Sequence, residues 1–252
     1  MDNLLKAYDR EIRINLKYPD IVNVSHTRNF IKIEGPFDFI SYWNIPEESA
    51  SQLVREQVGY YRKNKAVIWR VFDHDKPANL ETVLKAEGFE YADSVTLVAL
   101  PLAETDTQAR FESDKHDVRE LAKPAELHDF LAVTETAFGE PSPNDYAYLY
   151  SLLPVPNFKF YVAYQDNKPV AAARFIIPDE TRFGLLFGGC VIPACRGKGI
   201  YKALVNSRAR LAKQMGLEYL VTEARESSRP ILESMGFKPL VKGRTWNLYP
   251  TT

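Results

Sequence analysis

The sequence has little net charge, few cysteines and no long apolar run, and each shortage excludes a class of protein. Its 32 basic and 33 acidic residues leave a formal net charge of −1. No overall field therefore attracts nucleic acid or an anionic membrane, and we expect neither as a partner. The two cysteines, Cys190 and Cys195, form neither a disulfide framework nor a zinc pattern.

Targeting and metal signals are also scarce. The first residues lack the long apolar region of a signal peptide, and no run reaches the length needed to cross a bilayer. Together with the cysteine usage this predicts a cytoplasmic protein. The four histidines are scattered without ligand spacing, so we expect no metal site. A hydrophobic content of 45% is enough for a sizeable core in one large domain or two small ones.

The most informative stretch runs from Gly188 to Leu204 and combines an apolar strand, a basic glycine loop and a helix. Such a loop presents unpaired backbone N–H groups and the positive end of the helix dipole to a phosphate. Neither G-x-x-x-x-G-K-[ST] nor G-x-G-x-x-G is present. Six basic residues and no acidic one lie between Arg196 and Lys213, of which we expect phosphate contacts only from Arg196 and Lys198. The others are equally explained as a solvated helix face.

Hydrophobic periodicity predicts alternating helices and strands along the whole chain. Ile45-Pro46 precedes a helix, a buried strand and a short helix that ends at Gly88-Phe89. Ile192-Pro193 precedes the same series, which ends at Gly236-Phe237. The spacings of 43 and 44 residues indicate a duplication, although chance spacing of common residue pairs is an alternative. The polar stretch between the copies predicts modules at 1–102 and 116–252 joined by a linker at 103–115.

The loop Arg196-Gly197-Lys198-Gly199-Ile200-Tyr201 resembles the R/Q-x-x-G-x-G/A motif with which GNAT-superfamily N-acetyltransferases hold the pyrophosphate of acetyl-CoA. Tyr201 departs from the Gly or Ala usual in the family. The resemblance implies an α/β (α+β) fold of two GNAT-like modules, each a mixed, mostly antiparallel sheet flanked by helices. The first copy has Glu47 and Glu48 in place of the loop, which would repel a pyrophosphate, so it resembles a degenerate module.

The resemblance also implies which residues contact acetyl-CoA as the acyl donor. The strand end would pair with the pantetheine arm and polarise the thioester carbonyl, and the loop would hold the phosphates. Gly188-Gly189 would permit a bulge that frees backbone groups, or would only allow tight packing. The family's frequent Asn in the last helix is replaced by Arg225, for which Ser227 or Ser228 can substitute. The expected cofactor contacts are Cys190, Val191, Ile192, Arg196, Gly197, Lys198, Gly199, Ile200, Tyr201 and Ser228.

Acetyl transfer by direct amine attack needs a base and an acid. Glu223, at the end of the strand 219–222, is the candidate base, with pairing to Arg225 or helix capping as alternatives. The tyrosine that serves as general acid in many members is replaced by Leu232, which leaves Tyr201 or water. Cys190 would be the nucleophile of a two-step route, but a buried structural cysteine is the simpler interpretation.

The acceptor would meet an acidic and aromatic rim containing Glu140 and Tyr146, which suits a cationic amine, or these tyrosines pack against the first module. We therefore predict an N-acetyltransferase that modifies a primary amine of a small molecule or peptide and acts as a monomer or homodimer. One alternative is a non-catalytic acyl-CoA-binding or scaffold module. A second is an amide-forming enzyme that uses another activated acyl donor.

Overall fold

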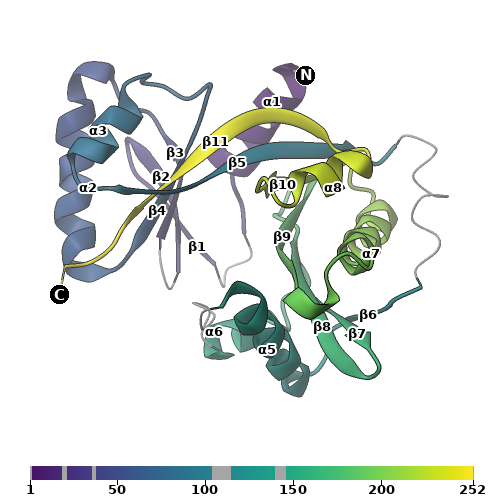
Figure 1. Ribbon diagram of the computed structural model, residues 1–252. Coiled ribbons are helices and arrows are strands. Elements are labelled where there is room, and N and C mark those ends of the chain that lie inside the picture. Colours follow the sequence, from purple (N-terminus) through teal and green to yellow (C-terminus); the bar gives the residue numbers. More distant parts are fainter. Residues whose placement is uncertain (1, 19–21, 36–37, 104–114, 140–145, 252) are drawn as a thin grey trace. The chain divides into compact units, whose positions relative to one another are not determined.

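The computed structural model describes residues 2–18, 22–35, 38–103, 115–139 and 146–251, which form two compact units (Figure 1). The first unit consists of Met1–Val98, Glu223–Pro230 and Pro239–Thr252. The second consists of Ala99–Thr222 and Ile231–Lys238. Most of the predicted linker, residues 104–114, lies outside the described residues. Both units combine helices with mostly antiparallel strand pairs, as the predicted fold class requires.

The first unit has the strand order β1-β2-β3-β4-β11-β5. Neighbouring strands β1 to β3 pair antiparallel, β3 and β4 pair parallel, and β4 pairs antiparallel with β11. The strands are β1 Asn23–His26, β2 Phe30–Glu34, β3 Asp38–Trp43, β4 Val67–Phe72, β5 Glu90–Pro101 and β11 Lys238–Leu248. The helices are α1 Asp2–Tyr8, the π-helical η1 Asp9–Ile14, the 3₁₀ turn η2 Glu47–Ser49, α2 Ala50–Asn64 and α3 Leu80–Ala86.

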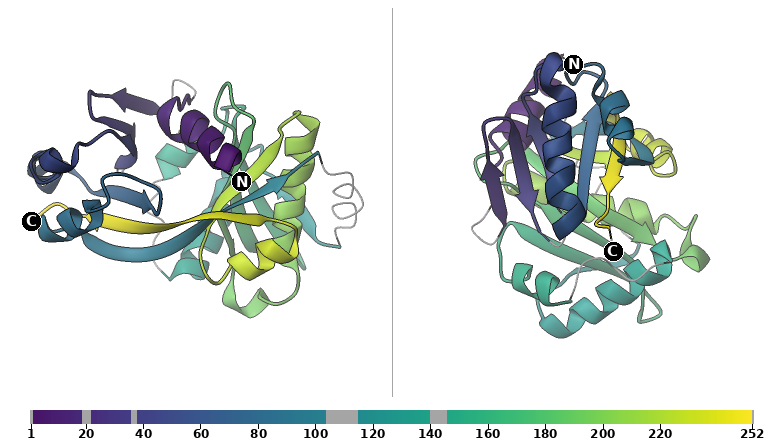
Figure 2. Two further views of the ribbon diagram at one scale, coloured as in Figure 1. Left: turned by 90° about the horizontal axis from the view of Figure 1, so that it is seen from above. Right: turned by 90° about the vertical axis from the view of Figure 1, so that its left-hand side faces the viewer.

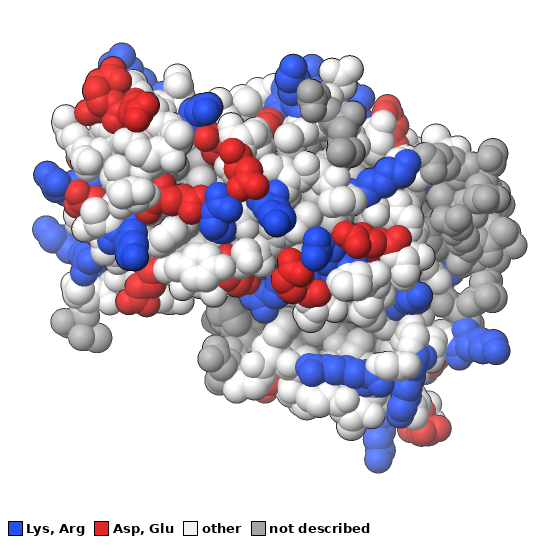
Figure 3. Space-filling view, turned by 45° about the horizontal axis from the view of Figure 1, so that its top comes forward, with Lys and Arg blue, Asp and Glu red and all other residues white. Residues whose placement is uncertain are grey.

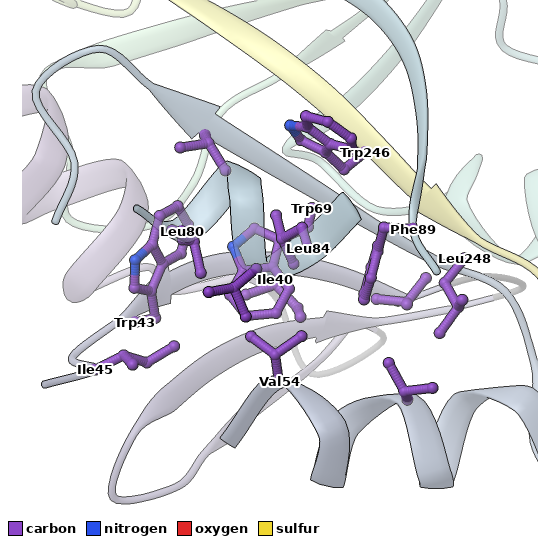
Figure 4. Packing of buried hydrophobic residues seen from close by; sticks show 14 of the residues in the cluster. Ile40, Trp43, Ile45, Val54, Trp69, Leu80, Leu84, Phe89, Trp246 and Leu248 are labelled. Carbon is purple, nitrogen blue, oxygen red and sulfur yellow. The ribbon is translucent and has the colours of Figure 1, made fainter. Parts of the chain in front are cut away.

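Trp69 is the centre of the first unit's core. Its side chain is fully buried, and its ring meets those of Phe30, Trp43 and Phe89 edge-on at centroid distances of 5.7, 5.4 and 5.9 Å (Figure 4). Helix α2 lies along the strands and adds apolar residues such as Val54 at helical spacing (Figure 2). The hydrophobic pattern predicts these strands and helices one by one, and the structure shows that they pack around one core.

The second unit has the strand order β10-β9-β8-β7-β6, in which β10 and β9 are parallel and the other neighbours antiparallel. Its strands are β6 Asp117–Glu120, β7 Phe158–Gln165, β8 Lys168–Ile176, β9 Phe183–Val191 and β10 Tyr219–Ala224. Its helical elements are η3 Pro124–Glu126, α5 Leu127–Phe138, α6 Tyr146–Leu152, η4 Pro193–Cys195, α7 Ile200–Gln214 and α8 Arg229–Ser234.

Helices α5 and α7 cover opposite faces of this sheet. Phe160 and Tyr161 are neighbours on β7, so their side chains point to opposite faces. The Phe160 ring meets Phe130 of α5 at 5.4 Å, whereas Tyr161 interacts with Arg208 of α7. Most of β8 and β9, apart from exposed positions such as Phe187 and Gly188, is therefore buried between two helical layers, which explains their largely apolar sequences.

The order of elements follows the repeat predicted from the sequence. Each copy runs from a strand through a 3₁₀ turn, a fifteen-residue helix, a parallel strand and a short helix that ends at a glycine with positive φ, Gly88 or Gly236. The copies differ at the helix start. Helix α2 follows η2 directly, whereas Arg196–Gly199 stand between η4 and α7. The basic glycine loop is thus an insertion of four residues that the first copy lacks.

The last strand of the chain does not stay with the second unit. Residues Gly243 to Leu248 of β11 pair with β4, and Trp246 and Leu248 join the first unit's core. The domain division predicted from the sequence differs from these two units, because it assigns residues 238–248 to the module 116–252. Hydrophobic alternation indicates a strand, but it does not say which sheet edge the strand joins.

Positive and negative side chains are mixed on the surface (Figure 3), as the near-zero net charge of the sequence predicts. Lysine and arginine side chains are interspersed with aspartate and glutamate on the face shown in Figure 3. Among the described helices, none is long and apolar enough to cross a membrane.

Candidate functional site

The basic glycine loop adopts a backbone that requires its glycines. Gly197 and Gly199 have φ of 78° and 84°, in the left-handed region that side chains disfavour. A β-carbon at Gly197 would meet nothing within 4 Å, so conformation and not crowding demands glycine there. Helix α7 begins at Ile200 without a side-chain cap. A helix start without a side-chain cap is the feature that an anion site requires, and anion binding at this loop stays a prediction.

Arg196 braces this loop. Its Nε donates to the carbonyl of Val191 at 3.1 Å, and an Nη donates to the carbonyl of Ala137 at 3.3 Å. These bonds tie the loop to the end of β9 and to the last turn of α5. Lys198 is exposed at the loop tip. A phosphate contact from either residue remains a prediction, but Arg196 also has a structural role that the motif does not reveal.

Strand β9 contains a bulge immediately before the loop. Ala172 of β8 faces Cys190, whereas Arg174 faces Phe187, so three steps along β9 match two along β8. Gly188 takes up the extra residue with φ of 58°. Both interpretations of the glycine pair apply, because Gly188 forms the bulge and the neighbouring glycine permits close packing. The bulge interrupts the strand ladder where the thioester is expected.

Tyr201, in the first turn of α7, packs on this bulge. A β-carbon built on Gly189 would lie 3.0 Å from Cε2 of the tyrosine ring and 3.6 Å from an Nη of Arg208. Any larger residue at position 189 would therefore require the ring to shift by a few tenths of an ångström. The phenol is half-buried and lies against the strand. Tyr201 is therefore beside the bulge, where the general acid of an acyl transfer would be needed.

Cys190 is better suited to packing than to nucleophilic attack. Its side chain is buried, and burial raises the pKa of the thiol to about 11 despite the nearby charges of Arg174, Arg196 and Arg208. The reactive thiolate is therefore scarce at neutral pH. Cys195 is also buried, and neither cysteine forms a disulfide.

Two predicted site residues, Glu223 and Ser228, belong to the first unit. Glu223 forms an ion pair with Arg70, and Arg70 also donates to Oγ1 of Thr245 at 3.0 and 3.1 Å. The ion-pair partner of Glu223 is thus Arg70 and not Arg225, which pairs with Asp93 at 2.8 Å. The Ser228 hydroxyl donates to the carbonyl of Arg225 at 3.2 Å within a turn. Their catalytic and cofactor roles remain predictions.

The predicted acceptor rim is only partly described. Glu140 lies outside the described residues. The Tyr146 ring stacks on His128 and Tyr150 at centroid distances of 4.9 and 6.2 Å, and its hydroxyl donates to the carbonyl of Pro124 at 3.1 Å. Tyr146 is thus held within a stack of rings on α5 and α6. Leu232, which replaces the family's tyrosine, is fully buried.

Arg208 is one of the basic residues that the sequence equally explains as a solvated helix face, and for this residue that interpretation is wrong, because it is only 1% exposed. The signal was its position four residues after Leu204 on the apolar stripe of α7, where a charged residue is unexpected. Within the described residues no group of histidine, cysteine, aspartate and glutamate side chains could hold a metal ion.

The corresponding bulge of the first unit is closed by the protein itself. Ile31 of β2 faces Tyr42 and Lys32 faces Ile40, so Ser41 is the extra residue of β3. Ser41 and Gly188 each lie five residues before the proline of their copy. Arg13 donates from Nε to the Ser41 carbonyl at 3.0 Å, and the Ser41 hydroxyl donates to the Arg13 carbonyl at 3.2 Å.

Comparisons with known proteins agree with this geometry. Residues 122–237 match the model of the acetyltransferase (GNAT) family. A functionally unknown conserved protein from Staphylococcus epidermidis has a TM-score of 0.66 at 14% identity, with 93% of this chain and 96% of that chain covered. For a GCN5-related N-acetyltransferase from Kribbella flavida the TM-score is 0.63 at 14% identity, with 100% and 94% covered.

A tandem GNAT protein from the clavulanic acid biosynthesis pathway has a TM-score of 0.59 at 13% identity, with 94% of this chain and 86% of that chain covered. A comparison with curated protein sequences found no significant match. Residues 122–237 are therefore a domain of the GNAT acetyltransferase family, and the two-unit fold of the whole chain is one that GNAT proteins adopt.

Proposed function

We propose that the protein is an acetyl-CoA-dependent N-acetyltransferase that acetylates a primary amine of a small molecule or peptide by direct attack. The inserted loop Arg196–Gly199 carries this proposal. Its positive-φ glycines lead into the uncapped start of a fifteen-residue helix, next to a bulged strand. This combination supplies backbone donors for a pyrophosphate and interrupted strand pairing for a pantetheine arm.

In this mechanism the loop and the first turn of α7 bind the pyrophosphate of acetyl-CoA. The backbone of Cys190 to Ile192 orients the thioester, and an N–H group there polarises its carbonyl. The neutral amine attacks the carbonyl carbon, the C–N bond forms and the C–S bond breaks. The leaving thiolate takes a proton from Tyr201, whose ring lies against Gly189. Cys190 acts through its backbone, because its thiol is not ionised at neutral pH.

The first unit would not bind acetyl-CoA. It lacks the four-residue loop, the start of its helix carries Glu47 and Glu48, and Arg13 occupies its bulge. Phosphate binding there would be opposed by two carboxylates, and the backbone carbonyl freed by the bulge is already bound. The first unit is thus a degenerate module in this proposal.

Glu223 is the candidate base, although its carboxylate is bound by Arg70. If it deprotonates the amine, Glu223→Gln lowers kcat at neutral pH and the loss disappears as the pH rises toward the pKa of the amine. A uniform loss at all pH values would exclude Glu223 as base. Water would then deprotonate the amine.

The test of the main proposal separates binding from turnover. Calorimetric titration with acetyl-CoA and with CoA measures binding, and release of free thiol across a panel of amines measures transfer. Saturable binding with amine-dependent thiol release is the expected result. Binding without release on any amine would support the non-catalytic alternative, and absence of binding to any acyl-CoA would refute the proposal.

A further inference from the structure

Arg208 is a buried cation that forms no ion pair with a carboxylate in the described part of the chain. Its Nε donates to the carbonyl of Leu204 at 2.9 Å and an Nη to the carbonyl of Arg174 at 3.0 Å. No described carboxylate forms an ion pair with it. Burial lowers its pKa to about 10, so the guanidinium remains charged at neutral pH. Burying a charge without a counter-ion is strongly unfavourable.

The fold itself does not require this charge. Helices α2 and α7 occupy the same place in the repeat, and both have fifteen residues. The ninth residue is Val58 in α2 and Arg208 in α7, and both are buried. An apolar side chain therefore serves at this position in the copy without the glycine loop. The guanidinium occurs only in the copy that carries the glycine loop. This difference indicates a role in the proposed acyl transfer.

The charge is directed at the bulge of β9. An Nη of Arg208 lies 3.6 Å from the position of a β-carbon on Gly189, and the Tyr201 ring lies 3.0 Å from the same point. Tyr201 and Arg208 therefore flank one glycine. A Tyr201 phenolate would attract the guanidinium, an interaction that by itself raises the pKa of Arg208. The attraction is mutual, so the same charge stabilises the phenolate.

The other titratable or charged groups near this pair come from four strands and from α7 itself, where Arg210 is a further cation near Tyr161. Tyr161 of β7 interacts with Arg208, and burial raises the pKa of this phenol while its hydroxyl donates to Glu120 of β6 at 3.2 Å. Cys190 of β9 stays protonated, and Arg174 of β8 is a second cation. The Glu120 carboxylate thus accepts from Tyr161 and forms an ion pair with Lys159 at 2.8 Å.

We propose that Arg208 is a positioning residue that stabilises negative charge at the β9 bulge and acts through Tyr201 during acyl transfer. When the C–S bond breaks, the CoA thiolate takes the proton of the Tyr201 hydroxyl. The resulting phenolate lies beside the Arg208 guanidinium, which transfers no proton. The phenolate then takes a proton from the positively charged nitrogen of the attacking amine or from solvent. Arg208 lowers the cost of this step because charge develops where a fixed cation already lies. This inference rests on the proposed acetyl transfer.

A first experiment measures the coupling without turnover. The full chain is labelled with [ζ-¹³C]tyrosine, the Tyr201 signal is assigned with Tyr201→Phe, and its ionisation midpoint is followed by NMR. Arg208→Met should raise the midpoint by about one pH unit or more, and Arg208→Gln, which keeps donors but not charge, should match it. Arg208→Lys should raise it less. An unchanged midpoint in the charge-removing variants that fold would overturn the proposal.

A second experiment uses the amine found in the thiol-release panel. Arg208→Met should lower kcat about tenfold in the native background, leave the Kd for acetyl-CoA unchanged and have no further effect in Tyr201→Phe. This non-additivity is the signature of one residue acting through the other. If the losses of kcat in the two single variants added up in the double variant, the proposal that Arg208 acts through Tyr201 would be overturned. Native protein that does not bind acetyl-CoA would refute the proposed function instead, while the NMR midpoint would still decide the Arg208–Tyr201 coupling.

Discussion

Replacing Gly197 by aspartate tests the phosphate site with the fewest side effects. A β-carbon at this position meets no atom within 4 Å, so no neighbour is displaced. The φ of 78° costs a non-glycine residue about 1 kcal/mol, and less for aspartate or asparagine. Gly197→Asn carries the same strain without the charge. The difference between the two variants therefore isolates electrostatic repulsion of the ligand.

The repulsion follows from Coulomb's law. A carboxylate about 6 Å from one phosphate charge, at an effective dielectric constant of about 40, costs about 1.4 kcal/mol. Two pyrophosphate charges raise this to about 3 kcal/mol, which weakens binding about 100-fold. The Kd for CoA from calorimetry should therefore be about 100-fold higher in Gly197→Asp than in Gly197→Asn.

Salt and the first copy provide controls for this prediction. The difference between the aspartate and asparagine variants should shrink between 50 and 500 mM salt, because exposed charges are screened. Ser49→Asp places the same charge at the start of helix α2, where no phosphate is expected, and should leave the Kd unchanged. Equal affinities of Gly197→Asp and Gly197→Asn would show that no anion is bound near this loop.

Three further predictions concern other parts of the chain. Arg196→Met should weaken acetyl-CoA binding and lower the unfolding free energy in the absence of ligand by about 1 kcal/mol in urea titration, because two bonds to backbone carbonyls are lost; unchanged stability would exclude the bracing role. The hydrogen bond from His74 to Asp9, at 2.7 Å, raises the pKa of His74, so its stabilisation is fully present below the unfolded pKa of about 6.5 and is lost as pH rises through the folded pKa. The urea midpoint should fall from pH 6 to pH 9 in the native protein and less in His74→Gln. A thiol reagent at pH 7 should modify Cys190 only when the protein unfolds, because burial raises the thiol pKa to about 11.

Local features of the site were predictable because they follow from local rules. The positive φ at positions 197 and 199 requires glycine, and the spacing of apolar residues after them predicts helix α7. The repeat indicated where each copy's helix and strand lie. The four-residue insertion was hidden, because the turn before α3 is three residues longer than the turn before α8 and offsets most of the insertion in the total spacing.

Features that depend on distant residues were not predictable. Glu223 meets Arg70, 153 positions earlier in the chain, and no local pattern indicates that pairing. Arg13 reaches Ser41 across the first unit for the same reason. Arg208 was visible in the sequence, but only the packing reveals that it is buried and that, among the described residues, its side chain donates to backbone carbonyls and forms no ion pair with a carboxylate.

The pairing of β11 with β4 sets an order in which the protein can mature on the ribosome. The first unit's core needs Trp246 and Leu248, yet the last residue of its N-terminal part is Val98. At about 5–20 residues per second, synthesis of the intervening stretch takes on the order of ten seconds or more. During that time the open edge of β4 has no partner from β11. The half that begins first is therefore finished last, after the half that carries the glycine loop has been synthesised.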